Sequence, residues 1–95
     1  MIDYLNAHLT DDITIDFLAE HFYLSRYHLM HAFKEETGYT IGNYLTTKRL
    51  LLARDQIAQG ESITTACYAC GFHNYSTFSR AYRKHFGCSP REQRN

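Results

Sequence analysis

The segment Gly71–Gly87 contains hydroxyl and cationic side chains that are spaced so as to share one side of a helix. Its sequence is GFHNYSTFSRAYRKHFG, in which Phe78, Tyr82 and Phe86 recur at four-residue steps, the spacing of a buried helical stripe. The residues predicted to project away from that stripe are Ser76, Ser79, Arg80, Arg83 and Lys84. Such side chains suit hydrogen bonding to base edges and contact with phosphates. The segment therefore predicts a helix that contacts a nucleic acid.

An earlier segment of the chain has the same design. Aligning Ser25–Gly38 with Asn74–Gly87, 49 positions later, pairs Leu29 with Phe78, and Ser25 and Asn74 are the predicted N-caps. The helices that precede these segments align at an offset of 48, so the turn of the second copy is one residue longer. An internal repeat of a helix pair, each ending in an outward-facing polar helix, predicts two helix-turn-helix units.

The first of the two outward-facing helices is expected at about Arg26–Glu36, with Leu29 and Phe33 facing inward. The residues predicted to face outward are Arg26, Tyr27, Met30, His31 and Lys34. Glu35 and Glu36 near its far end would repel phosphate, so contact is expected from the first two turns.

A single long helix is predicted to join the two units. Thr40 is its expected N-cap, and Ile41–Gln59 would be roughly 28 Å long at about 1.5 Å per residue. A rod of that length holds two reading helices near one DNA turn apart, about 34 Å, so that both enter successive major-groove segments on one face. Lys48, Arg49 and Arg54 along this helix are expected either to touch the DNA backbone or to be solvated charges.

The remaining elements complete an all-α fold of about seven helices. Short helices are expected over residues 2–9, after the caps Thr14 and Ser62, and from Ser89–Pro90 onwards. The chain has one proline, five glycines and no β-alternating run. We therefore predict two helix-turn-helix subdomains, residues 1–40 and 60–95, joined by a long central linker helix at 41–59.

The distribution of charge favours a nucleic-acid partner, although the formal net charge is zero. Residues 1–22 contain five acidic residues and no Lys or Arg, whereas residues 74–95 contain five basic residues against Glu92. The sequence contains neither a signal-peptide pattern nor a long apolar run, so no membrane partner is expected. Three cysteines, a number that cannot pair fully, indicate a reducing compartment and hence the cytoplasm.

Other functions are possible in principle. Cys67 and Cys70, with His73 three residues further on, resemble a metal or redox motif, but on a helix this spacing fills an inner face, so no metal and no cofactor are expected. No phosphate loop, nucleophile elbow or acid–base pair is present, so an enzyme is not expected. His28 and His31, with no carboxylate in helical register, are expected at the surface near DNA. The alternative function is a helical protein-interaction module without DNA binding.

The chain resembles, from about Ile2 to Arg94, the DNA-binding domain of the AraC/XylS family of bacterial transcription regulators. The most specific stretch is ITTACYACGFHNYSTFSRAYRKHFGCSP, with a small residue four before Gly-Phe, then Phe, Arg, an aromatic, a basic pair, Phe-Gly and Ser-Pro. LAEHFYLSRYHLMHAFKEETG of the first unit is nearly as close. The chain departs from the family pattern at His31, where a longer polar or basic residue is common, and at Cys67, where alanine is usual.

The resemblance implies DNA-contact positions. Base contacts fall on Arg26, Tyr27, Met30 and His31 in the first unit and on Tyr75, Ser76, Thr77, Ser79 and Arg80 in the second. Backbone contacts are predicted for Ser25, Lys34, Asn74, Arg83 and Lys84. Among all of these, Arg80 is expected to form a bidentate contact with guanine.

The resemblance also implies the partners. The chain would bind an asymmetric site in double-stranded promoter DNA, as a monomer or as part of a dimer, and regulate transcription by touching RNA polymerase. Most family members carry a further sensing or oligomerisation domain before this one, while a minority are the bare domain. The chain is thus expected to be the C-terminal part of a larger regulator, with any small-molecule effector bound by a domain absent from it.

Overall fold

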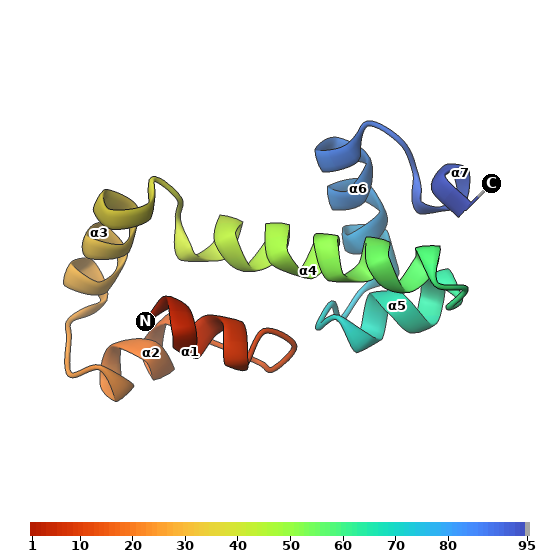
Figure 1. Cartoon of the computed structure of the whole chain (residues 1–95). Helices are drawn as coiled ribbons and strands as arrows, with labels where there is room; N and C mark the ends of the chain where they lie inside the picture. The colour runs from red at the N-terminus through yellow and green to blue at the C-terminus, as the bar shows by residue number, and fades with distance from the viewer. Residues whose placement is uncertain (95) are drawn as a thin grey trace.

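The computed structural model describes residues 1–94, and the side chains of residues 1–92, as an elongated array of helices measuring 45 × 21 × 21 Å (Figure 1). The helices are α1 (Ile2–Ala7), α2 (Ile15–His21), α3 (Arg26–Thr37), α4 (Ile41–Ala58), α5 (Ile63–Ala69), α6 (Tyr75–Phe86) and α7 (Pro90–Arg94). The predicted all-α fold with about seven helices is confirmed for this part of the chain. None of the helices in residues 1–94 is both long enough and apolar enough to cross a membrane.

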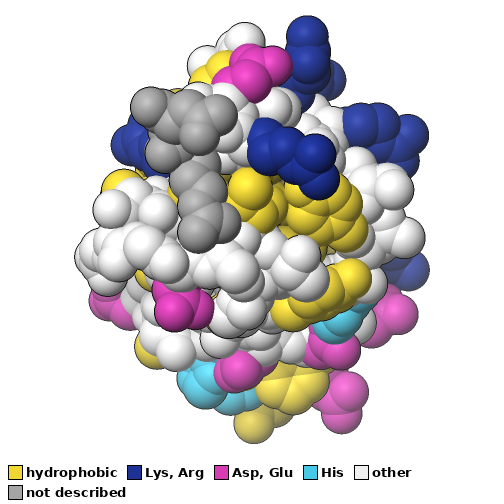
Figure 2. Space-filling model, turned by 90° about the vertical axis from the view of Figure 1, so that its right-hand side faces the viewer, with side chains coloured by type: hydrophobic (Ala, Val, Ile, Leu, Met, Phe, Trp, Pro, Cys, Tyr) yellow, Lys and Arg dark blue, Asp and Glu magenta, His cyan; other side chains and the backbone are white. Residues whose placement is uncertain are grey.

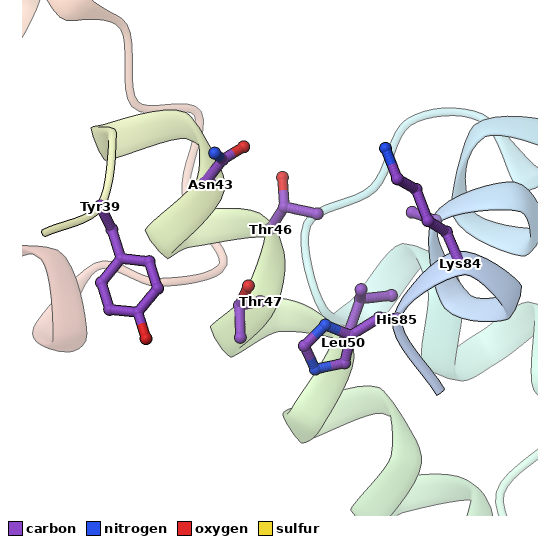
Figure 3. Close-up of a pocket in the computed structure, with 8 residues that line it drawn as sticks. Tyr39, Asn43, Thr46, Thr47, Leu50, Lys84 and His85 are labelled. Carbon is purple, nitrogen blue, oxygen red and sulfur yellow. The ribbon is translucent and has the colours of Figure 1, made fainter. Parts of the chain in front are cut away.

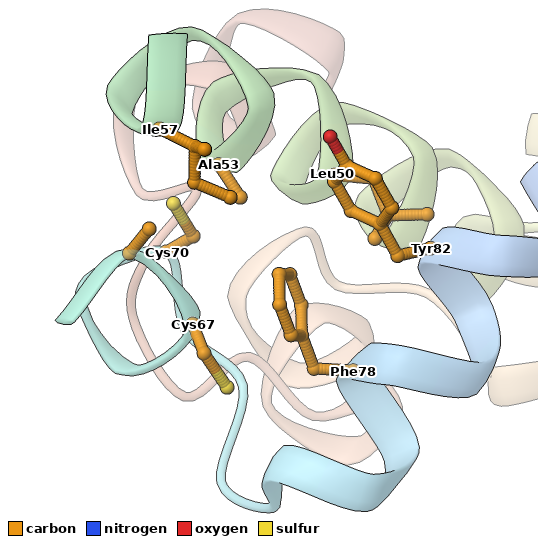
Figure 4. Close-up of a cluster of buried hydrophobic side chains, with 8 residues drawn as sticks. Leu50, Ala53, Ile57, Cys67, Cys70, Phe78 and Tyr82 are labelled. Atoms are coloured by element: carbon orange, nitrogen blue, oxygen red, sulfur yellow. The ribbon is translucent and has the colours of Figure 1, made fainter. Parts of the chain in front are cut away.

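Two helix-turn-helix units lie at opposite ends of α4, with α1 to α3 at one end and α5 to α7 at the other (Figure 1). The first core consists of Leu5, Leu18, Ala19, Leu29, Phe33, Ile41 and Leu45. The second consists of Leu50, Ala53, Ile57, Ala66, Cys67, Cys70, Phe78 and Tyr82, many of them drawn in Figure 4. Helix α4 therefore contributes buried side chains to both cores. The subdomain boundaries 1–40, 41–59 and 60–95 stay predictions.

Side-chain caps set the starts of five helices. The capping oxygens accept hydrogen bonds from backbone N–H groups three residues later, at 3.0–3.1 Å. The five capping residues are Thr14, Ser25, Thr40, Ser62 and Asn74. Each such cap contributes about 1 kcal/mol, and all five were expected from the sequence. Local chemistry therefore fixes where both reading helices, α3 and α6, begin.

The helix ends agree less closely with the sequence prediction. Both α3 and α6 end at a left-handed glycine, Gly38 and Gly87, as the sequence indicates. The prediction of a first helix over residues 2–9 was too long, because α1 ends at Ala7. The Nδ1 atom of His8 lies 3.0 Å from a carboxylate oxygen of Asp11, and the chain there turns into a loop. This loop runs towards the second unit (Figure 1).

Candidate nucleic-acid interface

Helix α6 separates an apolar face from a polar face. Phe78 and Tyr82 are completely buried and Phe86 packs against the same core, as the four-residue spacing predicts. The exposed side chains on the other side are Ser76, Thr77, Arg80, Arg83 and Lys84. Within the described chain, neither Arg80 nor Arg83 forms a salt bridge. Their guanidinium groups are thus available to an external anion.

Four of the predicted base-contact residues of α6 meet at one shallow hollow, which Tyr75, Ser76, Ser79 and Arg80 line. Two of them are less exposed than the sequence suggested. Ser79 is half-buried, and the ring of Tyr75 packs against the core with its centroid 6.1 Å from that of Phe78. Tyr75 therefore both lines the hollow and anchors the first turn of α6 on the core.

Helix α3 presents a more aromatic face. Leu29 and Phe33 are buried, and the five predicted outward residues, Arg26, Tyr27, Met30, His31 and Lys34, are exposed. The rings of Tyr27 and His31 stack with centroids 5.6 Å apart and planes 7° from parallel. Planar groups that are already stacked give this face a flat apolar surface flanked by polar atoms, which suits contact with base edges and thymine methyl groups.

Two residues of this face have carboxylate partners. The Nε atom of Arg26 lies 3.2 Å from Asp16 of α2, and Nε2 of His31 lies 3.5 Å from Glu35, one turn later in α3. The expectation that no carboxylate faces the histidines in helical register was therefore wrong for His31. In both pairs the side chains are well exposed, so water and salt screen the attraction, and a phosphate can compete with the carboxylate.

Charges are segregated on the face of the domain that Figure 2 shows. In Figure 2, most Lys and Arg side chains gather over the upper part of the view and most Asp and Glu side chains over the lower part. This face therefore has a mainly basic region and a mainly acidic region. A chain of zero net charge can attract a polyanion through such an arrangement, because the local potential rather than the total charge acts at short range.

A groove of about 540 Å³ lies between α4 and the C-terminal half of α6 (Figure 3). Its polar lining includes Asn43, Thr46 and Thr47 from α4 and Lys84 from α6. The hydroxyl, amide and ammonium groups of these residues can donate hydrogen bonds to a phosphate. Sequence reasoning could not select Asn43 or Thr46, because their closeness to Lys84 depends on how α6 packs on α4.

The three cations of α4 have different surroundings. Lys48 is exposed, with its ammonium 5.7 Å from the ring centroid of Tyr44, and the guanidinium of Arg54 lies 4.7 Å over the ring of Phe86. Arg49 is not a freely solvated charge, because its guanidinium donates hydrogen bonds to the backbone carbonyls of Leu9 and Asp11. Burial lowers the pKa of Arg49, and the nearby Asp12 carboxylate opposes that shift.

The cysteine pair has the packing role that its spacing predicts. Cys67 and Cys70 are fully buried in the second core (Figure 4). Burial raises the pKa of both thiols, that of Cys70 to about 11, so both are neutral at physiological pH. His73 is exposed and lies 2.6 Å from a carboxylate oxygen of Asp12. In residues 1–94 no three His, Cys, Asp or Glu side chains are arranged to hold a metal ion.

Comparison with known proteins identifies relatives of this chain. A family model described as a helix-turn-helix domain matches residues 18–95. The HTH-type transcriptional activator RhaS of Escherichia coli O139:H28 is 37% identical over 95 residues, covering 99% of this chain and 34% of that protein. The chain thus spans about a third of the length of this relative.

Solved structures give the same answer. A transcriptional regulator from Chromobacterium violaceum, described as containing an AraC-type DNA-binding domain, is 33% identical, with a TM-score of 0.85 over 98% of this chain and 84% of that one. The DNA-binding domain of AdpA, solved in complex with a target DNA, is 26% identical, with a TM-score of 0.91 over 98% of this chain and 85% of that one. This chain therefore belongs to the family of AraC-type helix-turn-helix domains.

Proposed function

We propose that the chain is the DNA-binding domain of a bacterial transcription regulator and that it binds double-stranded promoter DNA through α3 and α6. One observation carries the proposal: two equivalent helices, each with a buried apolar face and an exposed polar face, are mounted on the same helix α4. With 18 residues, α4 is about 27 Å long at about 1.5 Å per residue. That length suits insertion of α3 and α6 into successive major-groove segments.

Different residues read bases and hold the backbone. Base contacts are assigned to Arg26, Tyr27, Met30, His31, Tyr75, Ser76, Thr77, Ser79 and Arg80. Backbone contacts are assigned to Ser25, Lys34, Asn74, Arg83 and Lys84, and the groove residues Asn43 and Thr46 join Lys84 at a phosphate between the two segments. Arg80 is the main base reader, because it lies in the same hollow as Ser76 and has no carboxylate partner in the described chain.

The domain acts in the cytoplasm. It is part of a larger regulator, since RhaS is about three times as long as this chain. Bound at a promoter, it contacts RNA polymerase and so changes transcription. A small-molecule effector, where there is one, binds a part of that regulator outside this chain. The naming of RhaS as a transcriptional activator supports this reading.

Fluorescence anisotropy tests the proposal. The domain should bind a mixed-sequence duplex at low salt with at least micromolar affinity that falls steeply as salt rises. On a duplex selected from a random pool, Arg80→Ala should lose about 1–3 kcal/mol and relax preference at one base pair, whereas Arg91→Ala in α7, outside the reading helices, should have little effect.

Two results would count against this function. Absence of salt-sensitive binding to any duplex would favour the protein-interaction alternative, for which the exposed aromatic side chains provide a surface. Equal losses on selected and random duplexes would make Arg80 a phosphate contact.

A further inference from the structure

The two units touch at a second place besides α4. The loop after α1, residues His8–Asp12, which we term the clasp loop, leaves the first unit and reaches the helix-turn-helix turn of the second (Figure 1). Asp12 lies 2.6 Å from Nε2 of His73, in the residues between α5 and α6. This contact joins residues 61 positions apart in the sequence.

Arg49 of α4 binds the clasp loop through two hydrogen bonds. Its Nε atom donates to the carbonyl of Leu9 at 2.8 Å, and its Nη2 atom donates to the carbonyl of Asp11 at 2.9 Å. Arg49 lies on α4 between Leu45, which belongs to the first core, and Leu50, which begins the second. A half-buried guanidinium that forks between two loop carbonyls fixes the loop over the middle of the linker helix.

The helix-turn-helix turns of the two units differ in whether they contact the clasp loop, and only the turn of the second unit does so. At the offset of 48 that aligns the preceding helices, Gly71 of the second unit corresponds to Tyr23 of the first. Both have positive φ, 102° and 57°, but Tyr23 is 95% exposed. A Cβ on Gly71 would lie 3.0 Å from Nε of Arg49 and 3.2 Å from the carbonyl oxygen of Thr10. The first unit thus tolerates a side chain where the second has the clasp loop.

A second connection changes the mechanics of the domain. Units that are joined only through one helix can twist relative to each other as the helix bends, whereas contacts at α4 and at the clasp loop together oppose such rotation. The two DNA-facing helices belong to different units, so their relative angle depends on this restraint.

We propose that Arg49 and the clasp loop are positioning elements that set the spacing between the two DNA segments the domain accepts. The proposal rests on DNA binding by both units. Arg49 does not touch DNA. It restricts how far α6 can rotate relative to α3, and so it converts two separate half-sites into one site of fixed length.

The first experiment compares Arg49→Met with Lys48→Met, which removes one charge from the neighbouring exposed position of α4. Duplexes would carry the two blocks of a selected site with the spacer lengthened or shortened by two base pairs, a rotation of about 70°. Wild type and Lys48→Met should lose at least about tenfold in affinity on the shifted duplexes, and Arg49→Met less than about threefold. Equal discrimination by Arg49→Met and wild type would overturn the proposal.

The second experiment needs no DNA, so it separates failure of the clasp from failure of DNA binding. Spin labels on Glu36→Cys and His85→Cys, with Cys88→Ser to remove the least buried native thiol, report the distance between the ends of α3 and α6. Arg49→Met should broaden the distance distribution, with the helical circular dichroism signal unchanged. An unchanged width in the folded variant would remove the positioning role.

A pair of glycine variants provides an independent check. Gly71 and Gly60 both have φ of 102°, but a Cβ on Gly60 meets no atom within 4 Å. Alanine at either position has the same backbone strain, and only at Gly71 does the added Cβ also crowd Arg49 and the clasp loop. Gly71→Ala should broaden the α3–α6 distance distribution, whereas Gly60→Ala should leave its width unchanged. Equal widths in the two variants would contradict the assignment of the clasp.

Discussion

Replacing Asp16 by asparagine should tighten DNA binding, because it releases Arg26. In the free domain, Nε of Arg26 lies 3.2 Å from the Asp16 carboxylate, across the turn between α2 and α3. If Arg26 contacts DNA, this ion pair must break on binding. Asparagine keeps the shape of the side chain and removes the charge that competes with the DNA.

The exposure of the pair sets the magnitude. The two side chains are 65% and 76% exposed, so the pair falls in the class of surface salt bridges worth about 0.2–1 kcal/mol. The wild-type domain loses that free energy when Arg26 moves to DNA, and Asp16→Asn does not. At about 1.4 kcal/mol per factor of ten, the variant should therefore gain up to about fivefold in affinity. Removing a negative charge near the phosphates acts in the same direction, within a Debye length of about 10 Å at 0.1 M salt.

The assay is anisotropy titration of a selected duplex at two salt concentrations, in a double-mutant cycle with Arg26→Ala. The gain from Asp16→Asn should shrink in the Arg26→Ala background and at high salt. Glu61→Gln, in the loop between α4 and α5, removes one exposed charge elsewhere and serves as the control. Asp16 lies in the first turn of α2, so the variant will also lose about 0.3–1 kcal/mol of stability, and its fold must be verified first.

Two results would contradict the release of Arg26 to DNA. A gain of the same size with and without Arg26 would mean that Asp16 acts only through its charge and that Arg26 does not move to DNA. Weaker binding by folded Asp16→Asn would mean that the ion pair positions Arg26 for DNA instead of withholding it.

Three other predictions follow from buried groups and from charge. Tyr82 is fully buried with its hydroxyl unpartnered in the described structure, so Tyr82→Phe should raise stability by about 1 kcal/mol, or Tm by about 4–8 °C; a loss of that size would indicate a hidden partner. Burial raises the pKa of the Cys70 thiol from 9.0 to about 11, so folding favours its neutral form. The free energy of unfolding, measured in urea, should therefore fall as pH rises from about 9 through 11, and it should fall less in Cys70→Ala. Parallel pH profiles of the two proteins would contradict this. Lys84→Ala should reduce the slope of log affinity against log salt by about one unit, and an unchanged slope would remove Lys84 from the interface.

Much of the fold could be predicted because its determinants are local. The caps Ser25 and Asn74 act on N–H groups three residues away, and the buried positions Phe78 and Tyr82 are one helical turn apart. A residue's own neighbourhood in the sequence contains this information. The same periodicity explains why the polar faces of α3 and α6 are exposed.

The features that sequence reasoning missed fall into two groups. Arg49 binds carbonyls 38 and 40 residues away, and carbonyl groups have no signature in the sequence, so nothing identified its partners. His31 and Glu35, by contrast, are four residues apart in one helix, and this pairing could have been read from the sequence. Tertiary packing also half-buries Tyr75, which α6 alone would leave exposed.

The most direct test of the two-helix account is the selection of bound duplexes from a random-sequence pool. We expect a recovered site with two conserved blocks whose centres are about 10 base pairs apart, one helical turn, with the preference in one block weakened by Arg80→Ala. Recovery of a single block, or of two blocks on opposite faces of the duplex, would contradict the claim that α3 and α6 read DNA together.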